Sequence, residues 1–391
     1  MKKALSLILV LAMALVALAG CGCSSDTATD PTGAAEGATF KIGGIGPITG
    51  GAAVYGTAVQ NAIQIAVDEV NAAGGINGYQ IEYKFADDEH DAEKSVNAYN
   101  SLKDWGMQML IGTVTSTPCI AVADEAAVDN MFLLTPSGSA VDCVANDNAF
   151  RICFSDPDQG AASAKYIADN AVATKVAVIY DSSDVYSSGI YEKFKAEAGV
   201  VGLEIVSAEA FTADNKTDFT VHLNKAKNAG AELVFLPIYY TEASLILTQA
   251  NTIGFAPIFF GCDGLDGILG VENFDTTLAE GVMLLTPFAA DADDELTKNF
   301  VATYQAKYGE IPNQFAADAY DCVYAVKAAC ENAGITPDMS VSEICEAMKV
   351  SMTEIQIDGL TGEGITWAAS GEPTKAPKAV VITDGAYVAA N

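Results

Sequence analysis

Short apolar runs alternate with longer segments of helical period along this chain. Residues 109–112 form an apolar run long enough for a buried strand. Thr117 and Pro118 then have the character of an N-cap and a first helical residue, and apolar positions recur at helical spacing up to Asn130. Residues 131–134 are a second apolar run. This pattern predicts a strand, a helix and a second strand, which is the repeating unit of a parallel sheet.

The same alternation repeats at intervals of roughly 25–35 residues on both sides of this stretch. Further strands are expected at residues 40–46, 79–86, 149–154, 175–180, 204–211, 232–237, 257–261, 281–286 and 380–382. Further helices are expected at residues 59–73, 92–105, 161–171, 190–198, 218–229, 242–253, 295–308, 316–332 and 341–348. The chain is therefore predicted to be an α/β protein with two doubly wound βαβ lobes.

Three turn-rich junctions interrupt the alternation, at residues 155–158, at Pro287 and at residues 360–362. Three crossings imply that each lobe is built from two separate pieces of chain. We expect lobe 1 to comprise residues 40–156 plus 287–362, and lobe 2 to comprise residues 157–286 plus 363–391. A terminal hairpin is expected after the third crossing, with residues 380–382 as the last strand.

Two hydroxyl-rich loops follow the first pair of apolar runs, at residues 115–117 and 137–139. Both are expected at the carboxyl edge of a parallel sheet, where open α/β sheets bind their ligands. The first loop also presents backbone N–H groups at a helix N-terminus, which suits an anion such as a carboxylate. This edge of the sheet is the candidate binding site.

Composition and charge exclude several classes of protein. The chain has 391 residues, of which 50% are hydrophobic and 8% aromatic, so two ordinary domains with a large core are expected. The formal net charge of −31 disfavours binding to nucleic acid or to anionic lipid. We therefore expect no nucleic-acid partner.

The first residues have the layout of an export signal. Lys2 and Lys3 precede an apolar run at residues 4–19, which ends in the sequence L-A-G-C at Cys21. This ending resembles a bacterial lipobox, in which Cys21 is lipidated and becomes the mature N-terminus. An ordinary signal peptide and a membrane anchor are the alternatives, but the run is short for a bilayer span. We expect a signal peptide at residues 1–20, a flexible tether at residues 21–39, and a lipid-anchored protein on the extracytoplasmic face of the membrane.

The remaining cysteines offer no clear metal site. They are Cys119, Cys143, Cys153, Cys262, Cys322, Cys330 and Cys345. None has C-x-x-C spacing and the chain has only two histidines, which disfavours zinc. Disulfides between residues 143 and 153 and between residues 330 and 345 would suit an exported protein. Buried free thiols are the other interpretation, and the sequence leaves both open.

Cofactor and catalytic motifs are missing or mismatched. The first predicted strand and the loop after it contain G-x-G-x-x-x-G, from Gly44 to Gly50, and not the G-x-G-x-x-G fingerprint of a dinucleotide-binding loop. Pro47 also removes an N–H donor that a phosphate-binding loop needs. The acidic run at residues 87–91 lacks the pattern of a calcium loop, so helix capping is the favoured interpretation. No G-x-S-x-G motif occurs. We expect no cofactor and no enzymatic activity.

What remains is a set of polar and aromatic residues at predicted strand ends. Ser116 and Ser139 come from the first half of the chain, and Tyr186, Tyr239 and Asp263 from the second. Tyr186 is expected in a loop at residues 181–188. Together these residues supply hydroxyl donors, a carboxylate and aromatic walls. That combination suits a zwitterion.

Five segments carry a resemblance to a known family. They are F-K-I-G-G-I-G-P-I-T-G-G-A-A-V-Y-G at 40–56, N-A-A-G-G-I-N-G at 71–78, L-I-G-T-V-T-S at 110–116, L-T-P-S-G-S at 134–139 and D-Q-G-A-A-S-A-K-Y-I at 158–167. Over residues 40–366 the chain resembles the type I substrate-binding proteins of bacterial ABC transporters, within their leucine/isoleucine/valine-binding branch. The resemblance implies two βα lobes that are joined by three hinge strands and close on a ligand.

The resemblance also implies roles for individual residues. Ser116 and Ser139 would bind a ligand carboxylate, while Ser139 and the carbonyl of Ser137 would meet its ammonium group. Asp263 would neutralise that ammonium. The residues expected around the ligand side chain are Tyr55, Tyr186, Tyr239 and Phe315. The segment Ser137-Gly138-Ser139 replaces a more apolar Ala-Ala-Thr pattern and Thr115 stands where a cysteine can occur, so the ligand could be more polar than leucine.

The implied function is capture of an amino acid, in the first place a branched-chain one, for an ABC importer. Its partners would be the permease and ATPase subunits at the membrane, and the protein itself is expected to be a monomer. One alternative keeps the fold and changes the ligand to an amide, a urea-like or an aromatic compound. Another alternative is a sensory lipoprotein.

Overall fold

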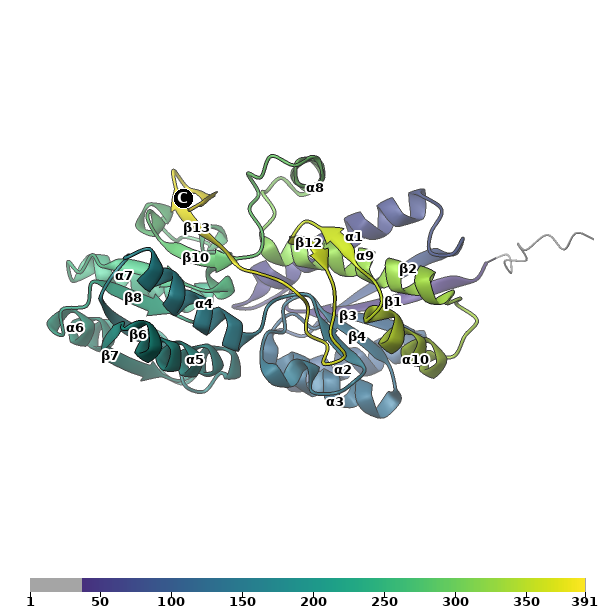
Figure 1. Ribbon diagram of the computed structural model, residues 1–391, viewed down its shortest axis with the longest axis horizontal. Coiled ribbons are helices and arrows are strands. Elements are labelled where there is room, and N and C mark those ends of the chain that lie inside the picture. Colours follow the sequence, from purple (N-terminus) through teal and green to yellow (C-terminus); the bar gives the residue numbers. More distant parts are fainter. Residues whose placement is uncertain (1–36, 391) are drawn as a thin grey trace, which may run out of the picture. The chain divides into compact units, whose positions relative to one another are not determined.

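The computed structural model describes residues 37–390 (Figure 1). The predicted signal peptide, most of the predicted tether and Cys21 lie outside the described residues. Among the helices that the structure describes, none combines the length and apolar character that a bilayer crossing requires. Two sheets organise the rest of the chain.

The first sheet has five strands, and every paired neighbour is parallel. In spatial order the strands are β2 (Gln80–Asp87), β1 (Thr39–Gly46), β3 (Met109–Gly112), β4 (Phe132–Thr135) and β5 (Ala149–Arg151). Side chains of successive residues point to opposite faces of a sheet. Accordingly Met109 and Ile111 belong to one hydrophobic core, whereas Leu110 belongs to another.

Helices cover both faces of this sheet. On one side lie α1 (Ala53–Ala72) and α9 (Gln314–Ala333), which pack against each other (Figure 1). On the other side lie α2 (Ala92–Trp105) and α3 (Ser116–Asp129). With helices on both faces, the ends of the strands are the accessible edge of the sheet, and loops at that edge can reach a ligand.

The second sheet has seven strands. In spatial order they are β14 (Ala386–Ala389), β13 (Lys378–Thr383), β10 (Met283–Thr286), β9 (Ile258–Gly261), β8 (Leu233–Leu236), β6 (Lys175–Asp181) and β7 (Glu204–Phe211). Most pairs are parallel, but β13 runs antiparallel to both β10 and β14. The prediction that residues 380–382 form the last strand is wrong. Asp384 and Gly385, both at positive φ, make the tight turn that adds β14.

Two helix pairs cover the second sheet (Figure 1). The pair α4 (Asp156–Asp169) and α5 (Val185–Val201) packs on the face that carries Val176, Val178 and Phe235. The pair α6 (Thr220–Asn228) and α7 (Tyr240–Thr252) packs on the opposite face. The predicted fold class, an α/β protein with two doubly wound sheets, is confirmed.

The chain passes between the two sheet regions three times. The second passage leads from β10 to α8 (Glu295–Tyr308), which contacts α1. The remaining elements are α10 (Val341–Met352), the hairpin β11 (Ile357–Gly359) and β12 (Gly362–Ile365), and the short helices η1 (Val141–Val144), η2 (Asp263–Leu265), η3 (Ile268–Gly270) and η4 (Thr276–Ala279). The lobe boundaries given above stay a prediction.

Buried carboxylates fasten the third passage to α9. Asp321 accepts hydrogen bonds from Leu360 N (2.8 Å), from Thr361 N (2.9 Å) and from Thr361 Oγ1 (2.6 Å). Asp318 forms an ion pair with Lys375 at 2.6 Å, and both side chains are buried. Charge-assisted contacts with α9 therefore hold the segment around residues 360–375 against the first sheet region, before the chain returns to the second sheet.

Several helices begin earlier than the hydrophobic pattern predicts. Helix α1 starts at Ala53, α4 at Asp156, α5 at Val185 and α9 at Gln314. Side chains of Ser155, Asp184 and Asn313 cap α4, α5 and α9, which hydrophobic periodicity does not reveal. Helix α1 has no side-chain cap. Helix α3 also begins at Ser116, so Thr117 is not its N-cap and Pro118 is not its first residue.

All seven cysteines in the described part of the chain are buried and free. Neither of the two disulfides left open by the sequence is formed. Cys330 instead lies among the methionine sulfurs of Met109 and Met348, at 3.9 and 3.7 Å. These cysteines act as small apolar core residues.

Candidate functional site

The residues predicted for the binding site line one cavity, which we call the central cavity. Its lining contains all eight of them, namely Tyr55, Ser116, Ser137, Ser139, Tyr186, Tyr239, Asp263 and Phe315, together with Val114, Thr115 and Gly264. The cavity measures about 10 Å³, which is roughly the space of one water molecule. An amino acid can therefore enter only when the walls of the cavity separate.

Each of these residues sits just beyond the carboxyl end of a strand or at the start of a helix. In the first sheet region, Ser116 follows β3 and begins α3, and Ser137 and Ser139 follow β4. Tyr55 lies in the first turn of α1, which follows β1, and Phe315 lies in the first turn of α9. The prediction that Tyr55 precedes the helix is wrong, because α1 begins at Ala53.

The second sheet region contributes the other three residues in the same manner. Tyr186 lies in the first turn of α5 after β6, and not in a loop as predicted. Tyr239 is the N-cap of α7 after β8, and Asp263 opens η2 after β9. The loops at the carboxyl ends of the strands of both sheets thus meet at the central cavity. Open α/β sheets bind their ligands at this end of the strands.

Hydrogen bonds join the two serine-containing loops. Ser137 Oγ donates to the carbonyl of Val114 at 2.6 Å, and Ser116 Oγ accepts from Ala140 N at 3.2 Å. Because the Ser116 oxygen already accepts, its own O–H remains available as a donor. Gly138 sits between the serines, where a Cβ would lie 2.7 Å from Cys119 Sγ. A residue without a side chain is therefore needed at this point of the loop.

Arg151 stabilises the loop that carries Ser137 and Ser139. It is the only arginine of the chain, and its side chain is completely buried. Its guanidinium donates to the carbonyls of Gly138 (3.1 Å), Ser139 and Ala140 (3.0 Å), and it forms an ion pair with Glu372 at 3.2 Å. The sequence analysis missed this residue, although a lone charge within the apolar run at 149–154 was a usable signal.

Asp263 is the acidic group of the central cavity. It is 4% exposed, and Tyr186 Oη donates to its Oδ1 at 2.7 Å. Its backbone is held by Gln159 Oε1, which accepts from Asp263 N at 3.2 Å, and by Gln314 Nε2, which donates to its carbonyl at 3.1 Å. Burial raises the pKa of Asp263 to about 7. A cationic group beside it would stabilise the ionised form.

Aromatic rings form the other walls. Tyr186 and Tyr239 stack with centroids 4.8 Å apart and planes within 8°, and Tyr55 contacts Phe315 at 4.2 Å. His90, which the prediction did not include, lies edge-on to Tyr239 at 5.4 Å, and its Nδ1 is 2.8 Å from Thr115 Oγ1. Rings in this arrangement present apolar faces to a ligand side chain.

Direct contacts connect the two sheet regions around the cavity. Tyr55 Oη donates to the carbonyl of Gly264 at 2.5 Å and accepts from Tyr240 N at 3.3 Å. Thr241 Oγ1 donates to the carbonyl of Gly51 at 2.7 Å. These bonds would have to break for the cavity walls to separate, so they belong to the closed arrangement of the site.

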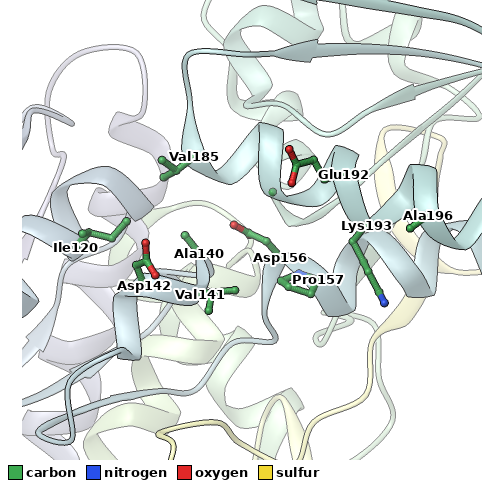
Figure 2. Close-up of a pocket in the computed structure, with 11 residues that line it drawn as sticks. Ile120, Ala140, Val141, Asp142, Asp156, Pro157, Val185, Glu192, Lys193 and Ala196 are labelled. Carbon is green, nitrogen blue, oxygen red and sulfur yellow. The ribbon is translucent and has the colours of Figure 1, made fainter.

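A larger cavity of about 440 Å³ adjoins this site at Asp156 (Figure 2). It lies between α3, η1, the first turn of α4 and the first three to four turns of α5. Figure 2 shows the Asp156 carboxylate facing Ala140 and Val185. Asp156 N donates to the carbonyl of Ser139 at 2.9 Å, but neither carboxylate oxygen has a hydrogen-bond partner among the described residues. Burial raises the pKa of Asp156 well above its usual range, which favours its neutral form.

The acidic run at residues 87–91 serves the local backbone, as the favoured interpretation predicted. Asp87 accepts from Ile48 N at 2.9 Å and from Thr49 Oγ1 at 2.6 Å, and Asp91 caps α2 by accepting from Lys94 N at 2.9 Å. Across residues 37–390, no three His, Cys, Asp or Glu side chains are grouped as a metal ion would require.

Comparisons with known proteins identify the family to which the chain is similar. The profile of the periplasmic binding protein family matches residues 39–386. The Leu/Ile/Val-binding protein homolog 3 of Brucella melitensis biotype 1 is 32% identical over 320 residues, which cover 80% of this chain and 84% of the relative. The leucine-, isoleucine-, valine-, threonine-, and alanine-binding protein of Pseudomonas aeruginosa is 28% identical over 311 residues, or 79% of this chain and 82% of the relative.

A solved structure is similar over nearly its whole length. It is the branched-chain amino acid transporter substrate-binding protein LivJ from Streptococcus pneumoniae, in complex with isoleucine. The TM-score is 0.81 and the sequence identity is 29%, and the match covers 90% of this chain and 98% of LivJ. Both the sequence relatives and this structure are binding proteins and not enzymes.

Proposed function

This chain belongs to the periplasmic binding protein family, and from that premise we propose that it captures a branched-chain amino acid for an ABC importer. Proteins of this family are extracytoplasmic solute-binding proteins. The observation that carries the choice of ligand is the lining of the central cavity, where hydroxyl groups, one carboxylate and aromatic rings meet. These are the partners that a zwitterion with an apolar side chain needs.

The ligand carboxylate would bind at the start of α3. Ser116 keeps a free O–H donor there, and the N-terminal N–H groups of the helix favour negative charge. Ser139 would add its hydroxyl, while its carbonyl is already occupied by Asp156 N and Arg151. The ammonium group would face Asp263 and the carbonyl of Ser137.

Closure would be a hinge motion between the two lobes, which we place at residues 40–156 plus 287–362 and at residues 157–286 plus 363–391. The ligand would favour the closed arrangement because its two charged ends bind residues from different lobes. The rings of Tyr55, Tyr186, Tyr239 and Phe315 would enclose its side chain. The contacts from Tyr55 to Gly264 and Tyr240 would form only on closure.

The N-terminal segment would tie the protein to the membrane. We propose that Cys21 is lipidated after removal of residues 1–20 and that the following segment is a tether. The permease and ATPase subunits of the importer would be the partners, and one copy of the chain would suffice for capture. Mass spectrometry of the purified protein would show a diacylated Cys21 at the N-terminus, and an unmodified Cys21 would contradict this assignment.

A ligand screen tests the proposed function. Leucine, isoleucine and valine should each raise the unfolding temperature of the purified protein. At about 100-fold its Kd, one bound ligand adds about 2.7 kcal/mol to the free energy of unfolding. No shift with any α-amino acid, together with a shift from a neutral amide or an aromatic acid, would replace the zwitterion by one of those ligands. Unchanged uptake in cells lacking the protein would favour a sensory role.

Amino-acid binding should weaken below neutral pH. The pKa of Asp263 is raised to about 7 by burial, and a bound ammonium lowers it because the cation favours the carboxylate. Binding is therefore fully favoured above pH 7 and loses up to about tenfold in affinity per pH unit below it, until the pKa of the complex is reached. Calorimetric titrations at pH 5.5 and pH 8 measure this difference. A flat profile in the native protein, equal to that of Asp263→Asn, would contradict it.

A further inference from the structure

A second cavity, which we call the acidic cavity, lies apart from the central one. It has two adjoining parts of about 430 and 290 Å³, which share Asp266, Leu269 and Tyr387 among their lining residues. The larger part lies between α8 and the strands β10, β13 and β14, and the smaller part reaches the first turns of α1. None of the eight residues of the central cavity lines either part.

Asp266 is the buried acidic group of this cavity. It is only 4% exposed, and its Oδ2 accepts from Gln314 N at 2.8 Å. Its Oδ1 has no hydrogen-bond partner within residues 37–390. Burial raises the pKa of Asp266 to about 7, so a cation beside this oxygen would stabilise the ionised form of the carboxylate.

No residue that lines the acidic cavity can supply that cation. Lysine, arginine and histidine are all missing from its lining. Instead, two further carboxylates, Asp291 and Glu310, lie at the exposed rim. The remaining walls are largely apolar and include Leu269, Phe288 and Val301. The cavity therefore attracts positive charge and also offers apolar surface.

We propose that the acidic cavity binds a small organic cation, with an ammonium group on Asp266 Oδ1 and a short apolar group against Leu269 and Val301. A bare metal ion does not fit, because no metal-binding group of three or more His, Cys, Asp or Glu occurs in the described residues. An anion would be repelled by Asp266, Asp291 and Glu310. Amino acids are disfavoured as well, because this lining has no basic side chain to meet a carboxylate.

Calorimetry with n-butylammonium at pH 8, above the pKa of about 7 of Asp266, tests the site. The native protein should bind n-butylammonium, whereas n-butanol and butyrate, which have the same chain without the positive charge, should bind at least about tenfold more weakly. Asp266→Asn keeps an oxygen for Gln314 N and removes the charge. It should weaken n-butylammonium binding by about tenfold or more. No measurable binding to the native protein, or equal binding to Asp266→Asn, would overturn the proposal.

Two further comparisons identify where the amine binds. Asp263→Asn should weaken n-butylammonium binding far less than Asp266→Asn does, and a loss in this variant equal to that in Asp266→Asn would place the amine in the central cavity and overturn the proposal. Ile311→Lys should also weaken binding by about tenfold or more, because Ile311 lines both parts of the acidic cavity and is 59% exposed. Val221→Lys is its matched control, since Val221 is 63% exposed and lines neither part.

The Ile311 pair also decides the matter if Asp266→Asn fails to fold. Both Ile311 and Val221 are exposed, so a lysine at either position is tolerated. Weaker n-butylammonium binding in Ile311→Lys with native binding in Val221→Lys supports the acidic cavity. Equal binding in the two variants would show that the amine does not occupy it.

Discussion

Replacement of Arg151 by methionine should lower the free energy of unfolding by about 3–5 kcal/mol, the cost of breaking a buried charged network by removing one partner. Methionine has a comparable length but no donor, so the carbonyls of Gly138, Ser139 and Ala140 would lose the guanidinium that binds them. Glu372 would also lose its ion-pair partner. Urea unfolding curves measure the loss.

The same change should weaken amino-acid binding, because the released loop carries Ser137 and Ser139. Arg151→Lys should be intermediate, since one ammonium cannot reach the three carbonyls that a planar guanidinium spans. Lys195→Met is a suitable control, because Lys195 is exposed and its loss should change stability by no more than about 0.5 kcal/mol. Native stability in Arg151→Met would show that the loop carbonyls are satisfied without this side chain.

Asp263→Asn should weaken amino-acid binding by roughly 1.5–3 kcal/mol, the strength of a hydrogen bond to a charged group. Asparagine keeps an oxygen for the hydroxyl of Tyr186, which donates to Asp263 at 2.7 Å, so the fold should tolerate the change. The loss would come from the missing negative charge opposite the ligand ammonium. Isothermal calorimetry with leucine at pH 8, where the native carboxylate is ionised, measures it.

A matched control separates this effect from the change in overall charge. Asp214 is exposed and lies outside the central cavity, so Asp214→Asn should bind leucine as the native protein does. If Asp263→Asn also binds leucine with native affinity, Asp263 takes no part in the site. If both variants lose affinity equally, the effect is long-range and not a contact.

The gathering of the site residues could be predicted from the sequence, because parallel strands place their carboxyl ends at one edge. Ser116, Ser139, Tyr239 and Asp263 each follow an apolar run that is recognisable as a strand. Since helices and strands alternate regularly, the two edges and their loops follow from the order of elements. The resemblance to a known family then placed the two serine loops and Asp263 in one site.

What the sequence did not reveal is how several of these side chains are held. Tyr55, Tyr186 and Phe315 belong to first helical turns, which precede the helix starts that hydrophobic periodicity predicts at residues 59, 190 and 316. The bond from Gln314 to the carbonyl of Asp263 joins residues 51 positions apart, and no local pattern indicates such a pair. Arg151 could have been singled out as a lone charge in an apolar run, but the backbone carbonyls that it binds have no sequence signature.

The seven buried thiols have a consequence for the way in which this protein matures. Their sulfur atoms pack as apolar groups and form no cross-link in the described part of the chain. Folding of this part therefore requires neither a thiol oxidase nor the reshuffling of wrongly paired cysteines. The described part of the chain therefore needs no oxidant to reach its native structure and should fold in fully reducing surroundings.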